Sequence, residues 1–109
     1  MKILTLKIND QKYMSGKINT YMTKEAMKIQ KAALDLGGKA KSIEHAELEE
    51  ATELMEALIE LSDRKTWLIC EVFENKFTPD ALDQNLSSEE IDATINMIIG
   101  AASGVIEKN

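Results

Sequence analysis

The chain opens with alternating apolar and polar positions, the pattern of a strand that buries one face. Every second residue from Leu4 to Ile8 is apolar, and the next two, Asn9 and Asp10, tolerate the left-handed backbone angles of a turn. Residues 12–18 can return as a second strand. The alternation there places two pairs of side chains on opposite faces: Met14 and Ile18 against Tyr13 and Lys17. We therefore predict a β-hairpin within residues 1–20, which must pack on other elements because a lone hairpin is marginal in water.

Helical spacing of apolar residues begins after this hairpin. Residues 23–36 predict a first helix with Thr23 as its N-cap. Its expected buried face is made of Ala26, Ile29, Ala33 and Leu36. Gly37 and Gly38 are expected to end the helix, because glycine adopts the left-handed C-cap conformation without steric penalty.

The longest periodic stretch is residues 44–75. It predicts one long helix or two, because Ser62 and Asp63 can cap a second helix. Its expected apolar stripe comprises Leu48, Ala51, Met55, Leu58, Leu61, Leu68 and Val72, widened by Leu54, Ile69 and Phe73. Residues 67–73 are apolar on almost every side of a helix, so we expect the centre of the core there.

Two further helix starts occur in residues 79–107. Thr78 precedes Pro79, which is the order of an N-cap and a proline at the first helical position. Ser87 and Glu90 have the spacing of a capping box. Together the elements predict a mostly helical α+β fold, an N-terminal β-hairpin followed by three or four helices. A length of 109 residues suits a single domain.

Charge is divided unevenly along the chain, whose net charge is -6. Residues 1–41 hold nine lysines against three acids, whereas residues 42–109 hold four basic residues against sixteen acids. An acidic chain argues against a general nucleic-acid binder, which needs an excess of Lys and Arg to neutralise phosphates. The basic part instead suits the acidic part, within one chain or between copies arranged head to tail.

The chain offers little catalytic chemistry. Cys70 and His45 are its only cysteine and histidine, which excludes metal sites that need two of either residue. Cys70 lies in an apolar stretch, where a free cysteine is typically a small buried hydrophobe. The acids of residues 44–60 lack the spacing of a calcium loop and are typical of a solvated helix face. We expect no enzyme activity, no metal and no cofactor, in a soluble intracellular protein without a leader or membrane span.

A more specific pattern runs from Val72 to Ile91. A helix ending in Val-Phe is followed by a short turn with Asn75, then Phe-Thr, a Pro-Asp step and a short helix, and finally Leu-Ser before an acidic helix start. This pattern resembles the tail assembly chaperones of long-tailed phages, in siphophages and prophages of Gram-positive bacteria. The lysine-rich opening with its Asn-Asp turn and the order of elements are similar as well.

The resemblance implies a non-enzymatic chaperone that coats the long, helical tape measure protein, keeps it soluble and helps recruit tail tube subunits. It also implies a location in the cytoplasm of the bacterial host and absence from the finished virion. A helical module with adaptable methionine side chains can shield the apolar stripes of such a partner. A basic end and an acidic end also suit self-association into head-to-tail multimers.

Two groups of residues are the candidates for partner binding. The first is the acidic face of the expected long helix, with Glu49, Glu53 and Glu56. The second comprises whichever members of an apolar cluster are exposed: Phe73, Phe77, Leu82 and Leu86, whose alternative role is core packing. An alternative function is an acidic helical adaptor or inhibitor that binds a basic protein partner. A third is an enzyme subunit that borrows its active site from a partner.

Overall fold

The computed structural model describes residues 3–41 and 47–103 of the chain. Its elements in chain order are β1 (Thr5–Ile8), β2 (Gln11–Met14), α1 (Thr20–Ala40), α2 (Leu48–Val72), α3 (Pro79–Asn85) and α4 (Ser88–Ser103). The predicted fold class is confirmed: the protein is mostly helical, with an N-terminal antiparallel hairpin followed by four helices.

The two strands are joined by a two-residue turn. Asn9 and Asp10 have φ angles of 50° and 62°, the backbone of a type I′ turn whose twist matches that of the strands. The turn sets the register, in which Leu6 lies opposite Tyr13. Directly opposite side chains share a face of the hairpin, so Tyr13 packs toward the core together with Leu6.

The predicted faces of the second strand are therefore wrong in part. Tyr13 and Ile18 both pack against the core, although the alternation placed them on opposite faces. Met14 is 54% exposed. The reason is that β2 ends at Met14, so the alternation does not continue to Ile18.

The helix α1 begins earlier than predicted. Asn19 is its N-cap, and the Asn19 side-chain oxygen accepts a hydrogen bond of 2.9 Å from the amide of Met22. The predicted cap, Thr23, lies inside the helix, where its hydroxyl donates to the carbonyl oxygen of Asn19 at 3.2 Å. Thr23 is buried, and a buried hydroxyl needs a hydrogen-bond partner. The carbonyl oxygen of Asn19, one turn earlier in the chain, is that partner, so Thr23 does not act as a cap.

The predicted end of α1 is also wrong. The helix passes through Gly37 and Gly38 and ends at Ala40. Glycine permits the left-handed conformation but does not require it, and neither of these glycines has a positive φ.

The helix α2 is a single helix, which answers the question that Ser62 and Asp63 left open. Its N-cap is Glu47, whose amide donates to a carboxylate oxygen of Glu50 at 3.2 Å. The chain leaves α2 through Glu74 and Asn75, whose φ angles are 59° and 56°. The two predicted caps that follow are confirmed. The hydroxyl of Thr78 accepts from the amide of Ala81, and Ser87 and Glu90 exchange the two hydrogen bonds of a capping box.

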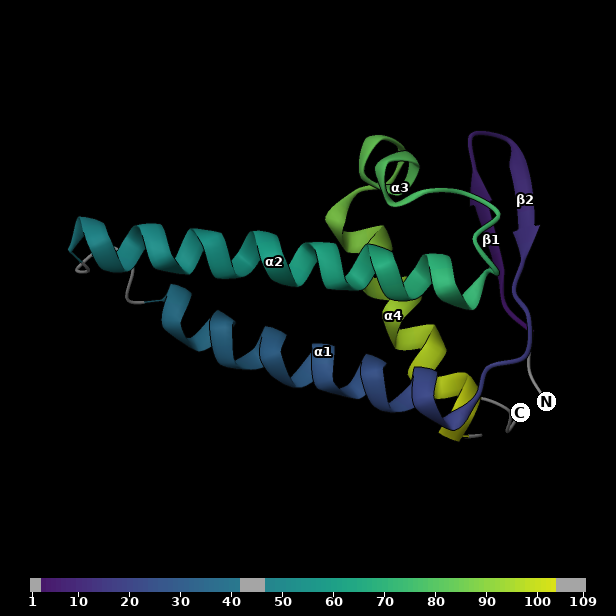
Figure 1. The fold of residues 1–109 in the computed structure, drawn as a ribbon, viewed down its shortest axis with the longest axis horizontal. Coiled ribbons are helices and arrows are strands. Elements are labelled where there is room, and N and C mark those ends of the chain that lie inside the picture. The colour runs from purple at the N-terminus through teal and green to yellow at the C-terminus, as the bar shows by residue number, and fades with distance from the viewer. Residues whose placement is uncertain (1–2, 42–46, 104–109) are drawn as a thin grey trace.

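The helices α1 and α2 are antiparallel neighbours, and they extend to one side as a two-helix arm (Figure 1). The hairpin, α3 and α4 all lie toward the other end, where α4 crosses behind α2 and packs on both long helices. The core is at this end and contains Phe73, Leu82 and Ile95, each at most 1% exposed. The molecule is consequently elongated, with extents of 47 × 29 × 23 Å.

Candidate partner-binding surface

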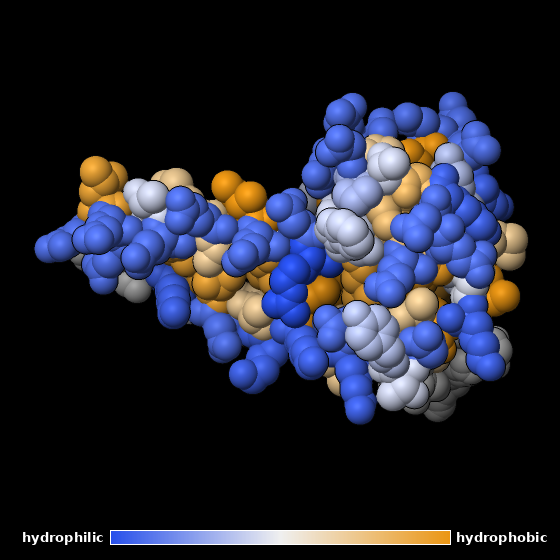
Figure 2. All heavy atoms as spheres, viewed as in Figure 1, coloured by the Kyte–Doolittle hydropathy of each residue, from blue (hydrophilic) through white to orange (hydrophobic). Residues whose placement is uncertain are grey.

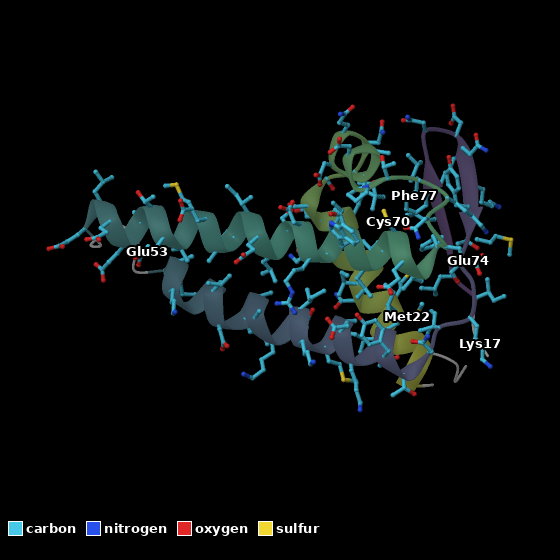
Figure 3. The ribbon with its side chains drawn as sticks, viewed as in Figure 1. Lys17, Met22, Glu53, Cys70, Glu74 and Phe77 are labelled. Carbon is cyan, nitrogen blue, oxygen red and sulfur yellow. The ribbon has the colours of Figure 1, made fainter. Side chains whose placement is uncertain are left out.

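The helix α2 carries one apolar stripe that is buried at one end and exposed at the other. Thr66 and Cys70 are 0% and 2% exposed, and Cys70 points from α2 toward α3 (Figure 3). Eleven residues make about three helical turns, so Met55 and Ile59 continue the face of Thr66 and Cys70. Leu48, Met55 and Ile59 are nevertheless 82%, 55% and 62% exposed, and we call these three residues the α2 ridge. Figure 2 shows hydrophobic side chains along this edge of the arm.

The expected stripe of α2 was thus only partly correct. Leu54, Leu61 and Leu68 are buried, whereas Leu48, Met55 and Leu58 are exposed. In the arm α2 has one helical neighbour, α1, and a single neighbour covers only one strip of a helix (Figure 1).

Acidic side chains line the α2 ridge on one flank. We call the set the acidic row: Glu49, Glu53, Glu56, Glu60 and Asp63, all of them exposed. Four of these acids line a shallow groove on α2 together with Ala57 and Ile59. The three acids predicted as candidates are in this row, and Figure 3 shows Glu53 on the arm, far from Phe77 and the core.

The outer face of α1 has the opposite charge. Met27 and Leu34 are 48% and 71% exposed, and we call them the α1 ridge. Lys24, Lys28 and Lys31 lie beside it and are exposed; we call them the basic row. Lys28 and Lys31 form ion pairs within α1 that are solvated, and the pair of Lys31 with Asp35 is also long, at 3.9 Å.

Two exposed aromatic side chains line a small pocket between α1 and α2, which we call the notch. Trp67 and Tyr21 are 69% and 56% exposed, which is unusual for side chains of that size. With Glu25, Arg64 and Glu71 they line a notch of about 160 Å³, which Ile29 and Leu68 line as well. Trp67 falls four residues after Asp63 and therefore continues the line of the acidic row.

Neither the α1 ridge nor the notch was predicted from the sequence. For α1 the signal was present, because Met27 and Leu34 lie off the predicted buried face of that helix. For Trp67 the prediction was wrong: residues 67–73 were expected at the centre of the core, but Trp67 is 69% exposed. An apolar residue off the core face is common on its own, however, and only the fold brings these residues into continuous surfaces.

Most of the predicted apolar candidates lie in the core and not on a docking surface. Phe73, Phe77 and Leu82 are 0%, 8% and 0% exposed. The ring of Phe77 meets Tyr13 edge to face at 5.0 Å and Phe73 at 5.5 Å. This cluster joins the hairpin to the end of α2. Since the three side chains are buried there, they do not form an exposed partner-binding surface.

Leu86, the fourth member, is partly buried and accessible. It lines a cavity of about 340 Å³ between α2 and the helices α3 and α4. Leu58 and Ser62 contribute the α2 side of this cavity, and Lys65 and Asp92, which form an ion pair of 2.6 Å, line it as well. Of the apolar candidates, only Leu86 remains available to a partner.

Of the two residues with catalytic chemistry, Cys70 lies in the described part of the chain. Burial, and secondarily the nearby Asp83 carboxylate, raise the pKa of the Cys70 thiol to about 11, so the thiol is protonated at neutral pH. His45 lies outside the described residues. In residues 3–41 and 47–103, no three His, Cys, Asp or Glu side chains are grouped to hold a metal ion. None of the helices in these ranges is both long and apolar enough to cross a membrane.

Comparison with known proteins gives one match. A protein-family model described as "Phage tail chaperone protein" matches residues 1–109, the whole sequence. Searches against curated proteins and against solved structures give no match.

Proposed function

Because the chain belongs to the phage tail chaperone family, we propose that it binds the tape measure protein and helps to recruit tail tube subunits. The site of action is the cytoplasm of the bacterial host, and the chaperone is released before the siphophage virion is complete. The observation that carries this proposal is the α2 ridge, an apolar stripe left uncovered along an arm and flanked by the acidic row.

The ridge has the form of a surface that receives a helix. Leu48, Met55 and Ile59 repeat at intervals of seven and four residues, which is the spacing at which one helix meets another. A tape measure protein is a long helix with apolar stripes, and it is poorly soluble while those stripes are exposed to water. Laying such a stripe on the ridge removes apolar surface from water on both proteins.

The acidic row determines which helix binds to the ridge and how that helix is oriented. Basic residues beside the apolar stripe of the tape measure helix pair with Glu53 and Glu56 and select that helix over acidic ones. Trp67 and Tyr21 contact the tape measure helix at the end of the acidic row that lies nearest the core. Large exposed aromatic side chains of this kind contribute much of the binding energy of many interfaces. An arginine or lysine of the partner can lie on the Trp67 ring with Glu71 beside it.

The function is binding without catalysis. The inert Cys70 thiol and the open, shallow surfaces of the arm support this, since catalysis needs a positioned nucleophile or base in a pocket. The acidic row also suits the second candidate, an adaptor or inhibitor of a basic protein. The uncovered ridge favours the chaperone, because charge alone does not require exposed leucine, methionine and isoleucine side chains.

The experiment is co-purification with the tape measure protein encoded by the same phage. In the variant Glu49→Lys, Glu53→Lys, Glu56→Lys we expect the tape measure protein to be lost from the purified complex. A matched control reverses three exposed acids at the other end of the molecule, Asp80→Lys, Asp83→Lys and Glu89→Lys, and is expected to retain it. Equal binding by both variants, with circular dichroism showing both folded, excludes the acidic row from the interface.

A further inference from the structure

The hairpin leaves the outer edge of β1 open. In an antiparallel pair only alternate residues of a strand bond to the neighbouring strand. The amide of Ser15 donates to the carbonyl oxygen of Leu4 at 2.8 Å, and Leu6 lies two residues along and bonds to β2 in the same way. The backbone groups of Thr5 and Lys7 therefore point away from β2. Among the described residues, β1 pairs with no second strand, and no hydrogen bond outside the hairpin involves the backbone of Thr5 or Lys7.

The outer edge of β2 is different, because it is tied to the end of α2. The carbonyl oxygen of Met14 accepts a hydrogen bond of 2.8 Å from the Lys76 ammonium group. The amide of Gly16, just beyond the strand, donates to the carbonyl oxygen of Val72 at 3.1 Å. A strand added along β2 would have to displace the Lys76 contact, whereas a strand added along β1 displaces no contact that the structure describes.

The outer face of the hairpin carries positive charge without a counterion. Lys7 of β1 lies directly opposite Lys12 of β2, and both side chains are exposed. Like charges at directly opposite positions are unfavourable. In the part of the chain that the structure describes, neither lysine forms an ion pair. A carboxylate brought to this face by another protein would relieve the repulsion between the two ammonium groups.

The inner face of β1 has the opposite character. Leu4 and Leu6 pack against the core but are only partly buried. Since side chains alternate along a strand, every second side chain of an added strand would lie beside these two leucines. The strand that suits both faces therefore alternates acidic and apolar residues. A second copy of β1 is unsuitable, because it would bring further lysines to the outer face, and edge lysines of this kind prevent pairing between copies.

We propose that the open edge of β1 binds an acidic, amphipathic β-strand of a partner protein, which extends the two-stranded sheet by one strand. The backbone groups of Thr5 and Lys7 bond to the added strand, and Lys7 and Lys12 attract its carboxylates. Its apolar side chains cover Leu4 and Leu6. A nucleic acid is a poorer fit, because the chain as a whole carries a charge of -6 and phosphates gain nothing from the two leucines.

This site goes beyond the proposed binding of a tape measure protein. Figure 1 shows the hairpin at the opposite end of the molecule from the tip of the arm, so a strand on β1 and a helix on the α2 ridge can be bound together. The variant Lys7→Glu with Lys12→Glu is therefore expected to co-purify with the tape measure protein as the wild type does. Failure of one proposal is thus distinguishable from failure of the other.

The test is amide hydrogen exchange of the isotopically labelled full chain, followed by NMR, with a synthetic peptide that alternates valine and glutamate. We expect the peptide to slow exchange at the amides of Thr5 and Lys7, because the new ladder protects them. The amide of Lys12 points to the other edge of the hairpin and is expected to keep its rate. Protection is expected to weaken with added salt, and a peptide that alternates valine and lysine is expected to give none.

Variants test the charge and the backbone contacts separately. Lys7→Glu with Lys12→Glu is expected to lose the glutamate peptide and to bind the lysine peptide instead. A matched control reverses two exposed lysines of α1, Lys24→Glu and Lys31→Glu, and is expected to bind like the wild type. Thr5→Pro removes an amide that points away from β2, as edge strands tolerate, and is expected to lose the peptide. Thr5→Val is expected to retain it.

Circular dichroism of each variant checks that it is folded. Three results would each overturn the proposal. The first is a glutamate peptide that protects neither Thr5 nor Lys7 in the wild-type chain. The second is equal binding of the two peptides. The third is displacement of the bound peptide by a single-stranded DNA oligonucleotide, which would mean that the lysines bind phosphates and not the carboxylates of a strand.

Discussion

Lys65 of α2 and Asp92 of α4 form an ion pair with an Nζ to Oδ1 distance of 2.6 Å. The Lys65 side chain is only 17% exposed, whereas Asp92 is 53% exposed, so the pair lies at the edge of the packed end of the molecule. The pair lines the same cavity as Leu58 and Leu86, and it joins α4 to α2 near the point where the arm begins. The contact therefore helps to hold α4 against α2.

We expect a double-mutant cycle on this pair to give a coupling energy of about 1 kcal/mol, near the upper end for pairs that are partly exposed. The substitutions are Lys65→Met and Asp92→Asn, with urea unfolding as the measurement. The pair Lys31 and Asp35 is the control, because at 3.9 Å and with both side chains exposed it is expected to give almost no coupling. Equal coupling energies for both pairs would contradict the expectation that the partly buried pair is the stronger one.

Apolar residues of the core and of the surface are expected to differ in how much their substitution lowers the free energy of unfolding. Phe77→Ala removes a ring that contacts Tyr13 and Phe73, and we expect it to lower the free energy of unfolding by about 3 kcal/mol. Met55→Ala, at an exposed position, is expected to change it by less than about 0.5 kcal/mol. Chemical denaturation measures both. A small effect of Phe77→Ala would show that the cluster is not the core.

The turn after α2 can be improved by substitution. Glu74 has a φ of 59°, a left-handed conformation that is unfavourable for a residue with a Cβ. Its ion pair with Lys76 is 3.9 Å long and solvated, and so contributes little. We expect Glu74→Gly to raise the free energy of unfolding by about 0.5 to 1 kcal/mol. Thermal unfolding is the measurement, and a fall in the midpoint would mean that the Glu74 side chain has an unrecognised role.

The Cys70 thiol is expected to be unreactive in the folded chain. Its pKa is raised from 9.0 to about 11, mainly by burial. The folded state therefore holds this proton more tightly than the unfolded state does. The resulting stability is fully present below pH 9.0 and is lost as the pH rises toward about 11. A disulfide reagent at pH 8 is expected to label the thiol only at the rate of unfolding, and rapid labelling would contradict the burial of Cys70.

The sequence predicts local structure best where a side chain bonds to its own backbone segment. The capping box of Ser87 and Glu90 and the cap at Thr78 were both found as predicted, because each depends on only four residues. The bounds of α1 were less predictable. Asn19 and Thr23 are both acceptable caps, and burial of Thr23 by the fold decides between them.

The candidate surface depended on tertiary structure in the same way. The periodic stripe of α2 indicates only that Met55 and Thr66 share a face of one helix. Whether that face is covered depends on where α3 and α4 pack, which no local pattern encodes. The acids Glu49, Glu53 and Glu56 were predictable as exposed because charged side chains are almost never buried alone.

The central claim is that the α2 ridge keeps the tape measure protein soluble. The most direct measurement is the soluble fraction of the tape measure protein on co-expression with this chain or with its variant Leu48→Ser, Met55→Ser, Ile59→Ser. All three residues are exposed, so the variant is expected to fold, which circular dichroism checks. We predict a soluble tape measure protein with the wild-type chain and an aggregated one with the variant. An equally soluble tape measure protein with the folded variant would contradict the account.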